Sequence, residues 1–248
     1  VQGLIDRARK AQAVAEGYDQ QRVDELSRAV AWALVQPETV EDIARFCLEE
    51  TRMGNYESKL GKLYKKVRGI MHDINDVKTV GVSEIDSAKG IRRIAKPVGV
   101  LGSVGRAGRR ERCPASHGLL AIKSRDAVVF APHPRSQKTT YKVVQVVRDV
   151  LKRHGAPEDL LICAENPTMT MSAEIMAQSD PAIATGGAGM VKAAYSSGKP
   201  AYGVGVGNAA VVIAETADIP KDAARVPHTK SFADASGRYS ENSLTSPE

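Results

Sequence analysis

Cysteine is scarce in this sequence of 248 residues, and long apolar runs are missing. The three cysteines, Cys47, Cys113 and Cys163, lie far apart and form no CxxC pair, which excludes a disulfide scaffold and a clustered zinc site. Such sparse cysteine favours a reducing, cytoplasmic location. No run of about eighteen apolar residues occurs, so the sequence predicts no membrane span. Residues 1–9 carry charges where an export signal needs apolar side chains, so we expect no export.

Aromatic residues make up only 4% of the chain, although 42% hydrophobic residues suffice for a sizeable core. About half of the formal net charge of +6 comes from an arginine cluster at 106–112. A basic module that binds nucleic acid or another polyanion is therefore an alternative function, which we consider unfavoured because few aromatic side chains can stack on bases. A second basic group is predicted to form a solvated helix face and comprises Lys59, Lys62, Lys65, Lys66 and Arg68.

Residues 1–78 are predicted to be helical. Apolar residues recur at helical spacing from Val23 to Leu34, stop at Pro37, and resume after Thr39, a candidate N-terminal cap. Residues 79–97 change to two short strand-like runs around a polar turn, which predicts a β-hairpin. Residues 226–248 are polar and rich in serine, and we expect them to be disordered.

The middle of the chain, residues 98–225, alternates apolar strands with helices. Continuous apolar strands separated by helices of roughly ten to fifteen residues are typical of a parallel sheet covered on both faces. The fold class is therefore α/β, with a Rossmann-like sheet of the nucleotide-binding type. The predicted strands are 98–102, 126–131, 159–164, 181–185, 201–206 and 209–213, and the predicted helices are 139–153, 168–178 and 187–197.

The loop Ala131–Arg135 follows a predicted strand, at the edge where open α/β sheets bind ligands. Pro132 and Pro134 fix this loop, and we expect His133 and Arg135 to point outward. A rigid surface turn with a solvated histidine is the alternative interpretation.

Glycines follow two further predicted strands. Thr185, Gly186 and Gly187 precede a helix, where a phosphate can approach backbone N–H groups, although a tight turn is an equally good interpretation. Gly203 and Gly205 suit close packing of either backbone or ligand against a strand. The turn at 102–105 is a weaker candidate for a phosphate loop. Cys47 and Cys163 are predicted to be packed apolar residues, and no base is placed near Cys113.

Several long motifs occur in a characteristic order: KPVGVLGSV, AIKSRDAVVFAPHPRS, GAPEDLL, ATGGAGMVKAAYSSGKPAYGVGVGN and ETADI. Together they resemble the CoA-acylating branch of the aldehyde dehydrogenase superfamily, over roughly residues 20–220. The tail Ser240–Leu244 is similar to the stretch just past the nucleophile in the sulfoacetaldehyde-specific members. The resemblance implies an aldehyde-dehydrogenase-like fold, with a helical N-terminal part (1–78), an oligomerisation hairpin (79–97) and a dinucleotide-binding domain (98–225).

The resemblance also implies a reaction. A cysteine thiolate attacks the aldehyde, hydride passes to NAD or NADP, and CoA takes the acyl group from the thioester. Substrate aldehyde and CoA are thus the implied partners, and a homo-oligomer the implied assembly. Cofactor-binding positions carried over from the family are Pro132, His133, Pro134 and Arg135 at the adenosine ribose, Thr185, Gly186 and Gly187 at the phosphates, and Gly203 and Gly205 beyond them.

Two segments depart from the family pattern. An arginine-rich stretch at 105–113 replaces the segment whose asparagine helps to hold the oxyanion, as if the reading frame were locally shifted. Arg238 occupies the column of the nucleophilic cysteine, so we expect no catalytic residue and no thioester in this chain. The first methionine is Met53, and the match ends before the family's catalytic half, so we expect a truncated product.

The sequence also predicts which coenzyme is preferred. No aspartate or glutamate lies between Ala127 and Lys142, and Arg135 is available to contact a phosphate. Sites for NADP+ use an arginine where NAD+ sites use a carboxylate. The sequence therefore favours NADP+ over NAD+, with a solvent-facing Arg135 as the alternative.

Overall fold

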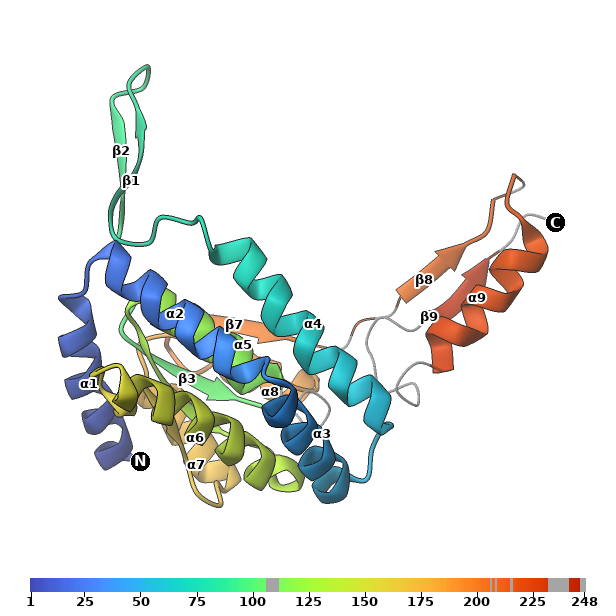
Figure 1. Ribbon diagram of the computed structural model, residues 1–248, viewed down its shortest axis with the longest axis horizontal. Coiled ribbons are helices and arrows are strands. Elements are labelled where there is room, and N and C mark those ends of the chain that lie inside the picture. The colour runs from blue at the N-terminus through green and yellow to red at the C-terminus, as the bar shows by residue number, and fades with distance from the viewer. Residues whose placement is uncertain (106–111, 206, 208, 215, 232–240, 246–248) are drawn as a thin grey trace.

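The computed structural model describes residues 1–105, 112–205, 207, 209–214, 216–231 and 241–245, without the side chains of 112, 113, 209 and 241–245. Its centre is a five-stranded parallel sheet in the order β5-β4-β3-β6-β7 (Figure 1). The strands are β3 (Val100–Val104), β4 (Ala127–Ala131), β5 (Leu161–Cys163), β6 (Ala182–Thr185) and β7 (Ala201–Val204). The predicted parallel sheet is confirmed, and its strand β4 has no exposed residue, whereas the edge strand β7 is partly exposed.

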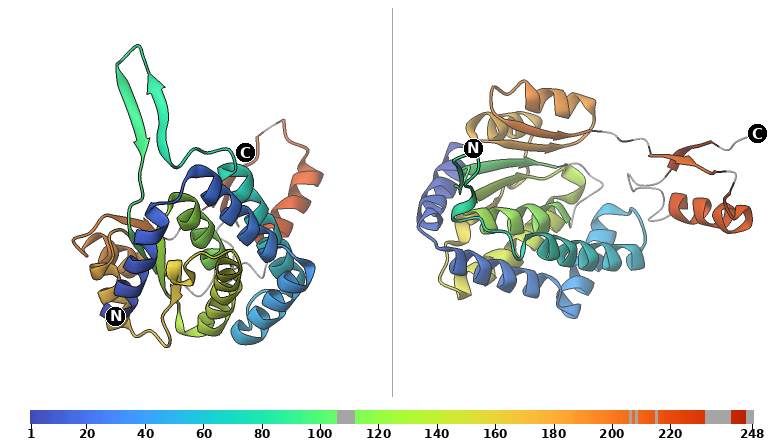
Figure 2. Two further views of the ribbon diagram at one scale, coloured as in Figure 1. Left: turned by 60° about the vertical axis from the view of Figure 1, so that its left-hand side comes forward. Right: turned by 90° about the horizontal axis from the view of Figure 1, so that it is seen from above.

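Helices cover both faces of this sheet (Figure 2). One face packs against α5 (Arg112–Ser124) and α6 (Gln137–Arg153), with α2 (Gln20–Leu34), α3 (Pro37–Thr51) and α4 (Tyr56–Ile74) outside them. The other face packs against α1 (Gln2–Glu16), α7 (Met169–Gln178) and α8 (Ala188–Tyr195). Short 3-10 turns, η1 (Pro134–Ser136) and η2 (Glu158–Leu160), precede α6 and β5.

Local sequence signals explain several helix starts. The side chain of Asp19 accepts a hydrogen bond from the backbone N–H of Arg22, so α2 begins with an N-terminal cap. The helix after Pro37 differs from the prediction. It begins at Pro37 itself, because the first helical position needs no donor N–H, and Thr39 lies within the helix and does not cap it.

The burial of Lys59 differs from the prediction. The sequence placed it on a solvated basic face of α4, but only 7% of its surface is exposed. Its Nζ lies 3.1 Å from the Sγ of Cys47, a fully buried residue of α3. This confirms the prediction that Cys47 is packed in the core. Lys59 therefore does not belong to the exposed basic face of α4.

Two carboxylates fix the beginning of the central strand, of which Asp126 is buried and Asp180 half-buried. Asp126 accepts hydrogen bonds from the N–H groups of Val98 and Gly99, at 2.7 and 2.9 Å. Asp180 accepts one from the N–H of Val100 at 2.8 Å and also pairs with Arg9 of α1. The beginning of β3 is thus held from two loops, and because the strands are parallel their far ends lie at one common edge.

A β-hairpin projects alone from the body (Figures 1 and 2). Its strands are β1 (Gly81–Asp86) and β2 (Ile91–Ala95), paired antiparallel. Ile85, Ile91 and Ile94 are each at least half exposed on it. The hairpin thus carries apolar side chains that no described residue covers.

The last described part of the chain forms a separate small unit (Figure 1). Here β8 (Ala209–Val212) pairs in parallel with β9 (Glu241–Thr245), next to α9 (Ile219–Ser231). The sequence predicted β8 as a further strand of the series, and the structure pairs it outside the main sheet. Within the tail expected to be disordered, α9 continues to Ser231 and β9 is a strand, while 232–240 and 246–248 lie outside the described residues.

Candidate coenzyme-binding edge

The carboxyl ends of the five strands meet at one edge of the sheet. The strand order reverses between β3 and β6, so the chain leaves these two strands toward opposite faces, and open α/β sheets bind ligands at such a switch point. The loop after β4 and the glycine turn after β6 flank this position on either side. The fold therefore brings together the two segments that the sequence singled out separately.

The loop after β4 is held by His133. Its Nδ1 accepts a hydrogen bond from the backbone N–H of Arg135 at 3.1 Å, and its carbonyl accepts the N–H of Ser136 at 2.9 Å. The ring expected to point outward thus caps the turn η1, and Pro132 beside it is buried. Arg135 and Pro134 are exposed, so Arg135 is the side chain of this loop that can reach a ligand.

Glu50 is a residue of this site that the sequence analysis missed. It lies in the last turn of α3, and its carboxylate accepts hydrogen bonds from the N–H groups of Lys138 and Thr139, at 2.9 and 2.8 Å. The hydroxyl of Thr139 donates to the same carboxylate at 2.5 Å. A faint signal existed, because the acids Glu49 and Glu50 are unfavourable near a helix C-terminus unless they have another partner.

The two glycines that follow β6, Gly186 and Gly187, have different surroundings. A Cβ atom added to Gly186 would lie 2.6 Å from Sδ of Met190, so this glycine lets α8 pack closely on the strand. A Cβ on Gly187 would meet nothing within 4 Å, and Gly187, Ala188 and Gly189 are exposed. No side chain caps the start of α8 and its first residues are exposed, an arrangement that fits an approaching phosphate.

Gly203 and Gly205 also differ in their surroundings. A Cβ atom on Gly203 would lie 2.6 Å from Cγ1 of Val191 and 2.7 Å from Cε2 of Tyr195. The backbone N–H of Gly203 donates to the Tyr195 hydroxyl at 3.1 Å. Gly203 therefore holds β7 against α8, whereas a Cβ on Gly205 would make only an ordinary contact of 3.9 Å.

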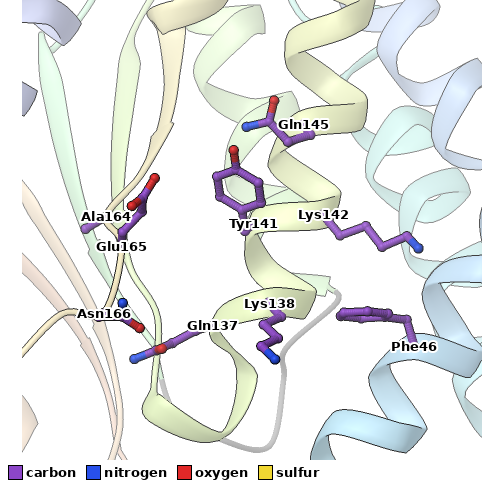
Figure 3. Close-up of a pocket in the computed structure, with 9 residues that line it drawn as sticks. All are labelled: Phe46, Gln137, Lys138, Tyr141, Lys142, Gln145, Ala164, Glu165 and Asn166. Carbon is purple, nitrogen blue, oxygen red and sulfur yellow. The ribbon is translucent and has the colours of Figure 1, made fainter.

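A cavity of about 550 Å³ lies beside the start of α6 (Figure 3). It is bounded by α6, by the chain just after β5 and by the ring of Phe46 on α3. Lys142 extends over that ring, with Nζ 4.7 Å from its centroid, and pairs with Asp42 at 2.6 Å. The lining residues are Phe46, Gln137, Lys138, Tyr141, Lys142, Gln145, Ala164, Glu165 and Asn166.

Two further titratable side chains, His117 and Cys163, lie close to the sheet. His117 of α5 lies 2.9 Å from the hydroxyl of Ser103 through its Nδ1 and stacks on Phe130. Burial lowers the pKa of His117 to about 4, so its ring is neutral at physiological pH. Burial and the neighbouring charge of Glu165 raise the pKa of the Cys163 thiol to about 12, which makes it a poor nucleophile.

Other expected features lie outside the described residues. These are Arg238, in the column of the nucleophile, and 106–111 of the arginine-rich stretch, while the side chain of Cys113 is also not described. In the part of the chain that the structure describes, no three histidine, cysteine or acidic side chains cluster as metal ligands would. No helix within that part is long and apolar enough to cross a membrane.

The strand order and the open start of α8 define an α/β protein with a dinucleotide-type binding edge. Comparison with known proteins narrows this class, although no family model matches the chain. It is 42% identical to a sulfoacetaldehyde dehydrogenase of an Acholeplasma species over 97% of its own length and 50% of that protein. It is 39% identical to the acylating sulfoacetaldehyde dehydrogenase of Bilophila wadsworthia, again over 97% of the chain and 52% of the relative.

Solved structures agree with these relatives. The acetylating aldehyde dehydrogenase of Geobacillus thermoglucosidasius superimposes with a TM-score of 0.94 at 36% identity, over 100% of this chain and 55% of the enzyme. The resemblance to CoA-acylating aldehyde dehydrogenases and the aldehyde-dehydrogenase-like fold are thereby confirmed. The chain spans about half the length of the curated relatives it matches.

Proposed function

We propose that this chain is the coenzyme-binding part of an NAD(P)-dependent, CoA-acylating aldehyde dehydrogenase. The observation that carries the proposal is the common edge at which the ribose loop after β4 flanks the uncapped start of α8. Pro132–Arg135 would surround the adenosine ribose, and Thr185–Gly187 would face the phosphates. Gly205 lies at the same edge, and Gly203 contributes by packing.

The proposed reaction of the whole protein converts an aldehyde, NAD(P)+ and CoA into an acyl-CoA, NAD(P)H and a proton. The coenzyme accepts the hydride when it is bound, and a cysteine carries the acyl group between aldehyde and CoA. Structural relatives support both ligands: an engineered glycolyl-CoA reductase has bound NADP+, and a propionaldehyde dehydrogenase of Rhodopseudomonas palustris has bound propionyl-CoA. Sulfoacetaldehyde is the proposed aldehyde because three similar proteins act on it by name.

Within the 248 residues we expect coenzyme binding without turnover. The nucleophile column holds Arg238, and the two cysteines with described side chains do not offer a thiolate to the site. Cys47 is fully buried beneath Lys59, and the Cys163 thiol has a raised pKa. Sustained reduction of NAD(P)+ with aldehyde and CoA, above a control without protein, would contradict this part of the proposal.

Coenzyme binding itself is tested with Gly187→Val. Its added side chain enters open space, so the fold should keep its melting temperature, but it blocks the approach of a phosphate to the start of α8. We expect titration calorimetry to show NAD+ or NADP+ binding to the unmodified chain and at least about tenfold weaker binding to the variant.

Gly61→Ala is the matched control. Gly61 lies on α4, where an added Cβ also meets nothing within 4 Å, and we expect it to leave the affinity unchanged. If the unmodified chain binds neither coenzyme, or if both glycine variants bind as it does, the proposed site is wrong.

Assembly and location complete the proposal. We propose a homo-oligomer in which the exposed apolar side chains of the β1–β2 hairpin are covered by another copy. We propose a cytoplasmic setting, for which the sparse cysteine content is the support. No described contact favours the alternative polyanion-binding function, and the burial of Lys59 weakens the basic surface that it needs.

A further inference from the structure

Glu50 is built into the start of α6 by three hydrogen bonds from a helix far away in the sequence. It accepts from the N–H groups of Lys138 and Thr139 and from the Thr139 hydroxyl. These two N–H groups are among the four at a helix start that lack a partner within the helix. The side chain of Ser136, at the usual capping position, makes no such bond, so Glu50 is the cap of α6.

This cap carries a negative charge. A helix N-terminus attracts anions because free N–H groups and the positive end of the helix dipole are located there. At α6 the carboxylate of Glu50 already occupies this anion-binding position. A phosphate arriving at the same place would meet two occupied donors and a like charge.

The position of the cap matters because α6 directly follows the ribose loop. Only Ser136 and Gln137 separate Arg135 from Lys138, which donates to Glu50. NADP+ differs from NAD+ by a phosphate on the adenosine ribose. Under the proposed function, this phosphate therefore approaches the start of α6.

We infer that Glu50 is a specificity-determining residue, which weakens the binding of NADP+ relative to NAD+ by holding a carboxylate at the start of α6. The inference rests on the proposed function, because it needs the ribose at the loop 131–135. It also opposes the sequence-based expectation of an NADP+ preference. That expectation considered only acids within 127–142, and Glu50 reaches the same place from α3.

Glu50→Gln tests this inference. The amide oxygen can still accept both hydrogen bonds from Thr139, whereas the N–H of Lys138, which donates to the other carboxylate oxygen, loses its acceptor. The charge is removed while most of the cap remains, so the start of α6 should stay formed. We expect the ratio of the dissociation constants, NADP+ over NAD+, to fall about tenfold, which corresponds to about 1.4 kcal/mol. The difference should shrink in about 1 M salt, where charge interactions are screened within about 3 Å.

Glu49→Gln is the matched control, because Glu49 is an exposed acid of the same helix turn. It should leave the ratio unchanged. A melting temperature measured for each variant shows whether the fold persists, and Glu50→Asp, which keeps the charge, should retain the unmodified ratio if that chain folds.

The outcomes are distinguishable. If the unmodified chain binds neither coenzyme, the proposed function fails and this inference with it. If both coenzymes bind but Glu50→Gln changes their affinities by the same factor, Glu50 is only a structural cap and the inference is overturned. An equal change in the ratio for Glu49→Gln would assign the effect to general surface charge and would overturn it as well.

Discussion

Gly203 lets the structure be tested at a position where the sequence left packing and ligand binding equally open. A Cβ atom there would lie 2.6 Å from Val191 Cγ1 and 2.7 Å from Tyr195 Cε2, so Gly203→Ala forces α8 or its side chains to move. Gly205→Ala is the matched change two residues later, with a single contact of 3.9 Å. Neither glycine has a positive φ, so alanine fits both backbones.

The expected cost follows from these contacts. Overpacking costs about 1–3 kcal/mol, and replacing glycine returns about 0.4–1 kcal/mol by restricting the unfolded chain. We therefore expect Gly203→Ala to lower the free energy of unfolding by about 1–2 kcal/mol, or the melting temperature by roughly 2–8 °C for a chain of this size. Gly205→Ala should change the free energy by less than about 1 kcal/mol and, if anything, raise it.

Chemical denaturation followed by circular dichroism measures both changes. The double variant Gly203→Ala with Val191→Ala adds a sharper check, because removing Cγ1 relieves the nearest of the close contacts to the new methyl group and leaves the contact with Tyr195. The alanine at 203 should cost at least about 0.5 kcal/mol less in that background than alone. Equal stabilities for Gly203→Ala and Gly205→Ala, or additive losses in the double variant, would refute the packing role of Gly203.

Two further predictions concern charge. Arg135→Ala should weaken NADP+ binding by about 1.5–3 kcal/mol and leave NAD+ nearly unchanged, as measured by paired titrations, because a charge-assisted contact to the extra phosphate is lost. Equal losses for both coenzymes, or none, would remove Arg135 from the site. Because burial lowers the pKa of His117 to about 4, against about 6.5 in an unfolded chain, the unfolded state binds a proton first as the pH falls. Stability should therefore decrease between about pH 6.5 and 4, by up to roughly 3 kcal/mol, and this slope should persist in His117→Gln only if the assignment to His117 is mistaken.

The sheet was predictable from the sequence because its inner strands are buried on both faces. Segments such as 126–131 are apolar without alternation, and this pattern belongs to parallel strands covered by helices. The glycine turn after β6 was predictable for a similar reason, since glycines between a strand and a helix mark close backbone packing. The sequence could not show which glycines serve packing. Whether a Cβ fits at Gly186 or Gly203 depends on Met190 and Val191, which pack from α8.

The parts that were missed depend on contacts between distant segments. Glu50 and Thr139 are 89 residues apart, so no local pattern links them. Lys59 was assigned to solvent because its neighbours are basic, whereas its actual position depends on where α3 packs against α4. His133 was expected to face outward, but its own loop folds back so that the ring accepts an N–H two residues on.

The N-terminal helices help to hold both ends of the central strands, and this follows from where their polar side chains go. The α3 helix supplies Glu50 to the start of α6, and α1 supplies Arg9 to Asp180, the residue that also holds the first N–H of β3. Apolar residues of α1 to α4 share one continuous core with the sheet. The loop after β4 is thus held by His133 within itself and, at the helix that follows it, by Glu50 of α3. If Glu50 acts as we infer, coenzyme preference depends partly on a residue outside the strand-and-loop pattern by which such sites are recognised in sequences.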